Sequence, residues 1–127
     1  FNQKNIFWHG WLTGKDLDGI YVNSDFFILS LNSEGRQSLI LPSKLQTYFQ
    51  LKRPIFCVAR GAVKELIDFT GSGITTCNDD KKNIVESFNK ALNLNTRDRI
   101  KMADNGFKYY KENFKSETII REFLNFI

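Results

Sequence analysis

The chain has 127 residues, of which 42% are hydrophobic and 25% are charged. This composition is typical of one globular domain and excludes intrinsic disorder and collagen-like repeats, and no apolar run approaches the roughly 20 residues of a membrane-spanning helix. The net charge of +4 is concentrated in residues 41–64, which include five basic residues and no acidic one. A local basic excess favours an anionic ligand, with a lysine-rich solvated surface as the alternative.

The cysteines and the single histidine give no sign of a disulfide framework or a metal site. Cys57 and Cys77 lie in apolar, β-rich segments, so we expect reduced, buried thiols in a cytosolic protein. One histidine and no Cys-x-x-Cys spacing make a zinc site unexpected. Because the first residue is Phe1 rather than Met, we expect the chain to be part of something longer.

Short apolar runs rich in β-branched and aromatic residues alternate with helical patterns up to residue 77. The predicted strands cover residues 5–9, 25–31, 54–58 and 74–77. The predicted helices cover residues 15–22, 42–51 and 61–69, and a polar loop is predicted over 32–37. The run DFFILSL at 25–31 is nearly continuously apolar, as in a strand buried on both faces. This alternation predicts βαβ units and a parallel, Rossmann-like sheet with flanking helices.

The remainder of the chain shows only helical patterns. A helix capped by Asp79 or Asp80 is predicted to reach residue 92, with apolar residues at helical spacing. A second helix is predicted over 96–110, with a break at Asn105-Gly106, a pair that often ends a helix. A last amphipathic helix begins at Ser116. The predicted organisation is a single partial domain, with βα units in residues 1–78 and C-terminal helices in 79–127.

Ligands of parallel α/β sheets bind at the carboxyl ends of the strands. In this sequence those ends are followed by residues 10–11, 32–41, 59–62 and 77–79. Pro42 and Ser43 open a helix there, and its first N–H groups have no intrahelical partner. Lys44 adds a cation to that first turn, which is unfavourable for the helix unless an anion lies in front of it. This pattern predicts a phosphate cradle, with an ordinary solvent-exposed helix start as the alternative.

Further motifs follow in a fixed order: Pro42-Ser43-Lys44, Tyr48, Arg53-Pro54, Gly61, Glu65-Leu66-Ile67, Gly71-Ser72-Gly73 and Asn78-Asp79-Asp80. Together with NIFWHGWL at 5–12 and MADNGFKYYKENFKSETII at 102–120, the ordered set resembles the C-terminal domain of retaining GT-B glycosyltransferases of glycosyltransferase family 4. The likeness is greatest to the branch that carries a Pro-Ser-Lys helix, and it covers essentially the whole chain. It implies a truncated GT-B donor domain with a helical tail.

The resemblance implies how a nucleoside-diphosphate sugar would be held by its phosphates. Backbone amides at Ser43 and Lys44, with Pro42 before them, would bind the diphosphate. Arg60 and Gly61, at the end of another strand, are candidates for a further phosphate contact.

The resemblance also implies positions for the sugar, the ribose and the base. Glu34 and Gly35 lie in the loop that would face the sugar or ribose, and Thr47 would accept a hydrogen bond from the ribose. Gly10 and Trp11 would lie against the base, where Trp11 could stack, with core packing as the alternative.

Two departures from the family pattern affect these assignments. The wider family carries a Glu-x7-Glu motif, which falls here on Leu39 and Thr47, neither of which is acidic. The family's Gly-Lys before the proline appears as Lys52-Arg53, which predicts a changed turn.

The activity implied for the parent enzyme is transfer of a sugar, with retention, to an acceptor hydroxyl in polysaccharide or glycoconjugate synthesis. A UDP-sugar is the default donor, GDP stays open, and no cofactor or metal is expected. The acceptor domain lies outside this chain, so we expect the fragment to be inactive alone, with a homo-oligomer as an option. The expected location is the cytoplasm, with peripheral attachment to the inner face of a bacterial membrane and a lipid-linked acceptor left open.

Two other functions compete with this one. A GT-B sugar-nucleotide epimerase would need acid/base carboxylates and histidine in the cleft, and this segment supplies few. A basic nucleic-acid-binding module is motivated by the positive charge, but the basic residues lie on one βα segment without interleaved aromatics. We therefore expect no nucleic-acid partner.

Overall fold

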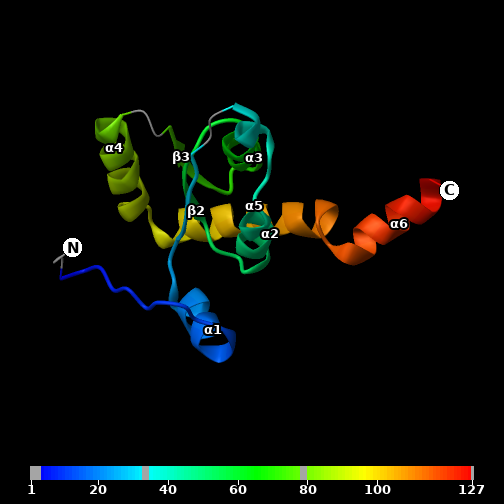
Figure 1. Cartoon of the computed structure of the whole chain (residues 1–127), viewed down its shortest axis with the longest axis horizontal. Coiled ribbons are helices and arrows are strands. Elements are labelled where there is room, and N and C mark those ends of the chain that lie inside the picture. Colours follow the sequence, from blue (N-terminus) through cyan, green and yellow to red (C-terminus); the bar gives the residue numbers. More distant parts are fainter. Residues whose placement is uncertain (1–3, 33–34, 78–79, 127) are drawn as a thin grey trace.

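A computed structural model of the chain describes residues 4–32, 35–77 and 80–126. Three parallel strands, β1 (Phe27–Ser30), β2 (Ile55–Val58) and β3 (Gly73–Thr76), form one sheet in the order β1-β2-β3 (Figure 1). Phe27 lies opposite Ile55, and Ile55 lies opposite Gly73. The predicted α/β class with a parallel sheet is therefore confirmed at this coarse, Rossmann-like level.

The helices follow the predicted order with small shifts at their ends. They are α1 (Gly14–Asn23), α2 (Ser43–Gln50), α3 (Ala62–Thr70), α4 (Lys81–Leu92), α5 (Thr96–Asn113) and α6 (Ser116–Phe126). The predicted loop after β1 contains a short 3-10 helix, η1 (Gly35–Leu39). Within the ranges described above, none of the helices combines the length and the apolar character needed to cross a membrane.

One face of the sheet carries the larger core. Side chains of β1 and β2 pack there against α2 and α3, in a buried cluster made of Leu29, Leu45, Phe49, Ile55, Cys57, Ala59, Val63 and Ile67. Tyr48 and the aromatic residues near the end of α5 close this cluster from outside. The spacing of these residues follows from alternation in the strands and helical periodicity in α2 and α3.

The opposite face carries a smaller core beneath α4. Phe56, Val58 and Ile74 of β2 and β3 pack with Ala91, and the rings of Phe56 and Phe88 meet edge to face at 5.3 Å between centroids. Every residue of β2 is buried, because β2 is central and covered on both faces. In β1, by contrast, only alternate residues are buried.

Helix α5 runs along the amino ends of the strands. Arg99 of α5 forms an ion pair with Asp25, two residues before β1, at 3.0 Å between Nη1 and Oδ1. Asn105 donates a hydrogen bond from Nδ2 to the carbonyl of Gly71, two residues before β3. The amino edge of the sheet is thus occupied by α5, and the carboxyl edge is where the loops after the strands gather.

The predicted strand at residues 5–9 is wrong. Residues 6–10 have no regular secondary structure, and Trp8 is 93% exposed. Strands form when their side chains pack against neighbouring strands and a covered face. Segment 4–13 lies at the end of the molecule opposite η1 and pairs with none of the three described strands (Figure 1).

The predicted helix break at Asn105-Gly106 is also wrong, because α5 continues to Asn113. Gly106 is buried, and a Cβ atom placed there would lie 2.7 Å from Cδ1 of Phe49. The glycine therefore provides space for α2 to pack against α5 and does not end the helix.

The predicted caps of the neighbouring helices agree with the structure. Asp80, one of the two predicted candidates, precedes α4 and accepts a hydrogen bond from the amide of Lys82 at 2.8 Å. Gly71 ends α3 in the left-handed conformation, and the amide of Ser72 returns to the carbonyl of Ile67. This is the hydrogen-bond pattern of a Schellman end, which favours glycine.

Candidate anion-binding site at the carboxyl ends of the strands

The start of α2 lies beside the carboxyl end of β1. Leu31 and Asn32, which follow β1, line a small cleft of about 170 Å³ together with Ile40 and Pro42. The amide of Leu31 donates to the carbonyl of Val58, so the sheet hydrogen bonding continues up to this cleft. The predicted phosphate cradle therefore lies at the edge where ligands of parallel sheets bind.

The first turn of α2 presents open backbone amides. Pro42 precedes the helix in an extended conformation, with φ −70° and ψ 141°, and provides no side-chain cap. The amide of Leu45 bonds to the carbonyl of Pro42 at 3.0 Å, whereas no acceptor within the described part of the chain meets the amides of Ser43 and Lys44. Both residues are exposed. An anion in front of this turn would meet two N–H donors and the positive end of the helix dipole.

Lys44 is the exposed cation of this turn. Two of the other basic residues of segment 41–64 form ion pairs away from this turn. Lys52 pairs with Asp104 at 3.0 Å, and Lys64 pairs with Asp68 at 2.5 Å. The hydrogen bond from Lys64 to Asp68 raises the pKa of Lys64, since it stabilises the ammonium form. The basic segment is thus divided between the two edges of the sheet.

A second helix start approaches the same edge. Gly61 precedes α3 with φ +70°, and a Cβ atom there would lie 2.2 Å from the carbonyl oxygen of Ser38 in η1. Only glycine allows this close approach between the loop after β1 and the loop after β2. Arg60 is exposed beside it, and the amide of Ala59 bonds to Thr76 of β3. The predicted residues Arg60 and Gly61 are therefore on the same edge as Pro42.

The predicted sugar and ribose residues are only partly placed. Gly35 begins η1, with φ +58°, and accepts a hydrogen bond at its carbonyl from the hydroxyl of Ser38. Thr47 is exposed one turn after Ser43 on α2, which places the two on one side of the helix. Glu34 lies outside the described residues.

The predicted base-contacting residues are not brought to this edge. Gly10 and Trp11 belong to segment 4–13, which lies at the other end of the molecule from η1 (Figure 1). Trp11 is 93% exposed, so it does not pack in the core. The expectation that they follow a strand end fails because the strand at 5–9 is not formed.

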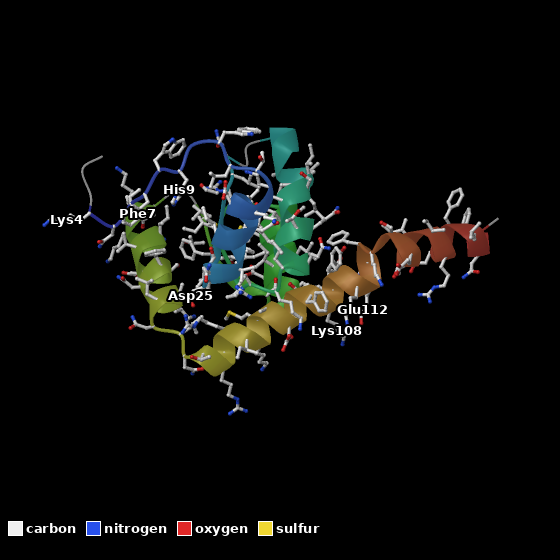
Figure 2. All side chains as sticks on the ribbon, turned by 90° about the horizontal axis from the view of Figure 1, so that it is seen from below. Lys4, Phe7, His9, Asp25, Lys108 and Glu112 are labelled. Carbon is white, nitrogen blue, oxygen red and sulfur yellow. The ribbon has the colours of Figure 1, made fainter. Side chains whose placement is uncertain are left out.

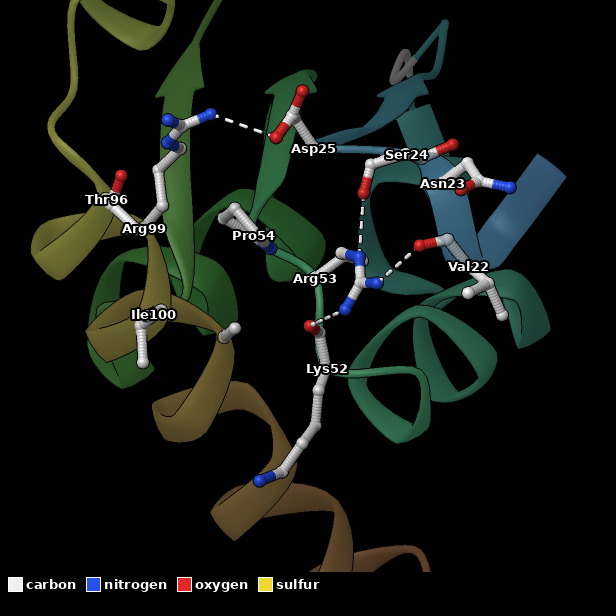
Figure 3. A pocket seen from close by; sticks show the side chains of 11 residues that line it. Val22, Asn23, Ser24, Asp25, Lys52, Arg53, Pro54, Thr96, Arg99 and Ile100 are labelled. Carbon is white, nitrogen blue, oxygen red and sulfur yellow. Dashed lines mark hydrogen bonds and ion pairs between the residues drawn. The ribbon is translucent and has the colours of Figure 1, made fainter. Parts of the chain in front are cut away.

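A larger cleft, of about 450 Å³, lies at the opposite, amino edge between α5 and the starts of β1 and β2 (Figure 3). Both of its arginines connect distant parts of the chain. Arg53 donates to the carbonyls of Ser24 and Val22, at 2.7 and 2.6 Å, and Arg99 pairs with Asp25. These contacts join segments that are about thirty and seventy residues apart, and no sequence pattern indicates them.

The two cysteine thiols differ in burial. Burial raises the pKa of the Cys57 thiol to about 12, with a smaller contribution from the negative charge of Asp68. Cys77 is only partly buried, so the expectation that both thiols are buried holds for Cys57 alone. Among the described residues no cluster of His, Cys, Asp and Glu could hold a metal ion. What the arrangement offers chemically is oriented donors and positive charge, suited to binding an anion.

Comparison of the chain with protein-family models, with curated proteins and with solved structures finds no match. The glycosyltransferase resemblance therefore depends on the motifs of the sequence itself, of which Pro42-Ser43-Lys44 and Gly61 lie at the edge described above.

Proposed function

We propose that this chain binds the diphosphate of a nucleotide sugar, as the donor-binding part of a retaining glycosyltransferase. The observation that carries the proposal is the open first turn of α2, with Ser43 and Lys44 exposed beside the carboxyl end of a parallel strand. The ordered motifs that resemble the glycosyltransferase family suggest that the anion is a nucleotide-sugar diphosphate. The N-terminus of a helix beside the end of a strand is well suited to binding phosphate groups.

The residues would divide the donor between them. The amides of Ser43 and Lys44 would bind diphosphate oxygens, and the ammonium of Lys44 would neutralise their charge. The Gly35 loop would face the sugar, and Thr47 would face the ribose. Arg60, beside Gly61, would lie at the same carboxyl edge of the sheet. Oriented donors of this kind stabilise the charge that develops on the departing diphosphate when the sugar is transferred to an acceptor hydroxyl.

The position of the basic residues gives no support to a nucleic-acid groove. Lys52 and Arg53 lie at the amino edge and are bound to Asp104 and to backbone carbonyls, whereas Lys44 lies at the carboxyl edge. A groove that follows a phosphate backbone requires a continuous basic track. No specific observation favours the epimerase alternative, which would need carboxylates and histidine in the cleft. The described cleft beside α2 is lined instead by Leu31, Asn32, Ile40 and Pro42.

The test is a backbone-amide NMR titration of the chain with UDP and, in parallel, GDP. We expect the largest shifts at Ser43 and Lys44. Lys44→Glu should weaken binding about tenfold, which corresponds to about 1.4 kcal/mol. Ser43→Pro should also weaken it, because proline is tolerated at the first helical position and removes one N–H donor.

Lys101→Glu is the matched control, since Lys101 is exposed on α5 and the charge change is the same. It should leave the affinity unchanged. Shifts that cluster at Arg53 and Arg99, or equal effects of the Lys44 and Lys101 variants, would contradict the proposal. Oligonucleotide binding with a steep salt dependence would favour the nucleic-acid alternative instead.

A further inference from the structure

The cleft of about 450 Å³ between α5 and the starts of β1 and β2, called here the amino-edge cleft, contains a guanidinium whose donors are only partly used. Arg99 of α5 donates from Nη1 to Oδ1 of Asp25 at 3.0 Å. Its Nε atom is buried, and among the described residues nothing accepts a hydrogen bond from it. A charged donor that is buried without an acceptor is costly, so such donors are normally paired. The Nε–H of Arg99 is therefore a donor suited to a ligand.

The pairing of Arg99 with Asp25 leaves a two-donor edge of the guanidinium open. Nε and the neighbouring Nη2 carry parallel N–H groups, which match the two oxygens of a carboxylate or a phosphate. In the described part of the chain no acceptor meets Nη2 either. Asp25 lies between the end of α1 and the first turns of α5 (Figure 2) and is 82% exposed. The Arg99 side chain is 31% exposed, so its guanidinium can turn this edge toward the cleft.

Other groups of the amino-edge cleft complete a small-molecule site. Thr96 lies three residues before Arg99 on α5, and none of the described residues bonds to its hydroxyl. Figure 3 shows Arg53 across the cleft from Arg99, with Pro54 between them. Apolar side chains supply the rest of the wall, from Val22, Pro54, Ile100 and Ala103. Apolar walls with a few convergent polar groups, in a volume of this size, are typical of sites for small molecules.

The charged residues around the amino-edge cleft leave an excess of one positive charge. Lys52, Arg53 and Arg99 line the cleft together with one carboxylate, that of Asp25. Lys52 pairs with Asp104 just outside it, whereas Arg53 donates to backbone carbonyls and has no carboxylate partner among the described residues. The first turns of α5 do not cancel this excess, since they add two basic residues and one acidic residue, Arg97, Lys101 and Asp98. The excess matches a ligand with one negative charge.

We propose that the amino-edge cleft binds a small monocarboxylate with an apolar body. Its carboxylate pairs with the Nε–Nη2 edge of Arg99 and accepts from the hydroxyl of Thr96, and its body lies on the apolar wall. A carboxylate carries one negative charge, whereas a phosphate monoester carries nearly two at neutral pH, so the carboxylate fits the charge balance better. The proposal is independent of the donor-binding function, because the cleft lies at the opposite edge of the sheet from Ser43 and Lys44.

The test is a heteronuclear NMR titration of the chain with benzoate, which has one carboxylate and an apolar ring. Benzoate should shift the side-chain Nε–H signal of Arg99, and its neutral isostere benzamide should not. Inorganic phosphate should bind this cleft more weakly than benzoate. The amide signals of Ser43 and Lys44 report separately on the α2 turn. Equal shifts with benzamide, tighter binding of phosphate at Arg99, or no benzoate shift there would each overturn the proposal.

Variants at the ion pair separate binding from folding. Arg99→Gln should weaken benzoate binding at least about tenfold, because a hydrogen-bonded charge pair is lost. Arg97→Gln makes the same change two positions earlier, on another side of α5, and should leave the affinity unchanged.

Because Arg99→Gln also removes the contact with Asp25, a second variant keeps the test independent of fold stability. Asp25→Asn removes a carboxylate that competes for Arg99 and repels the ligand, so it should tighten benzoate binding about fivefold. A purely structural ion pair predicts no such gain. Unchanged or weaker benzoate binding in Asp25→Asn, or equal losses in the Arg97 and Arg99 variants, would overturn the proposal.

Discussion

Lys52 has a left-handed backbone conformation, with φ +53°, at the position where the family pattern has glycine. The sequence predicts a changed turn there, but the conformation is the one that glycine commonly adopts. This conformation is strained for a lysine. Two contacts hold its side chain: an ion pair with Asp104, and a cation–π contact in which the ammonium lies 4.7 Å from the ring centroid of Phe107. In this chain a lysine and its side-chain contacts thus hold a left-handed turn.

This explanation predicts the order of two variants at the turn. Lys52→Gly and Lys52→Ala both lose the side-chain contacts, so their difference reports the backbone alone. We expect the glycine variant to be more stable than the alanine variant by about 0.5–1 kcal/mol, after the entropy of glycine in the unfolded chain is subtracted. Urea unfolding of the two variants measures this difference, and equal stability would contradict the strain.

Cys57 predicts how stability responds to high pH. Its pKa is about 12 in the folded state against an ordinary value of 9.0, so both states are protonated below pH 9 and the stabilisation is present in full. Above pH 9 the unfolded chain loses the proton first, and the free energy of unfolding should fall by about 1.4 kcal/mol for each further pH unit, up to about pH 12.

The measurement is urea unfolding at pH 8 and pH 10 for the natural chain and for Cys57→Ala. The natural chain should lose about 1.4 kcal/mol more than the variant between these two values. An identical loss in both would show that Cys57 is not the titrating group. The cavity that alanine leaves is the same at both pH values and cancels from the comparison.

At the scale of the elements, Gly106 gives the sharpest contrast between pattern and structure. Alanine normally stabilises a helix interior relative to glycine by about 1 kcal/mol. In α5, however, the added methyl group would meet Phe49, so Gly106→Ala should destabilise the chain by about 1–3 kcal/mol.

Gly19 in α1 is the matched control, since no atom lies within 4 Å of a Cβ placed there. Gly19→Ala should stabilise the chain by roughly 0.5–1 kcal/mol in the same unfolding experiment. If Gly106→Ala were stabilising as well, the close packing of Gly106 in α5 against Phe49 in α2 would be contradicted.

Elements that carry their own periodic pattern could be predicted from the sequence, and those that depend on a distant partner could not. The run around β1 and the helical spacing of α4 fix these elements locally, and Asp80 marks the start of α4. Residues 5–9 have the local pattern of a strand, yet pairing decides whether a strand forms, and they have no partner strand in the described part of the chain. The role of Gly106 could not be predicted, because the side chain that requires a glycine there, Phe49, lies 57 positions earlier in the sequence.

At the scale of the whole molecule, chain order alone fixed the edge at which the candidate site lies. Parallel strands with intervening helices bring Pro42 and Gly61 to the carboxyl edge, and the structure confirms this placement. The course of α5 across the amino edge could not be predicted, because it depends on the pairing of Arg99 with Asp25 and of Asn105 with Gly71. Gly10 and Trp11 do not lie at the predicted carboxyl edge. The strand predicted just before them does not form, because it has no partner strand in the described part of the chain.

The sheet has a consequence of its own, because β1 and β3 each pair with a strand on one side only within the described residues. Their outer backbone groups can accept an added strand while β2 keeps its covering on both faces. The sheet is therefore extensible: further βα units can be appended at either border without redesign of the middle. The same openness gives concentrated samples a template for irreversible, fibre-like growth.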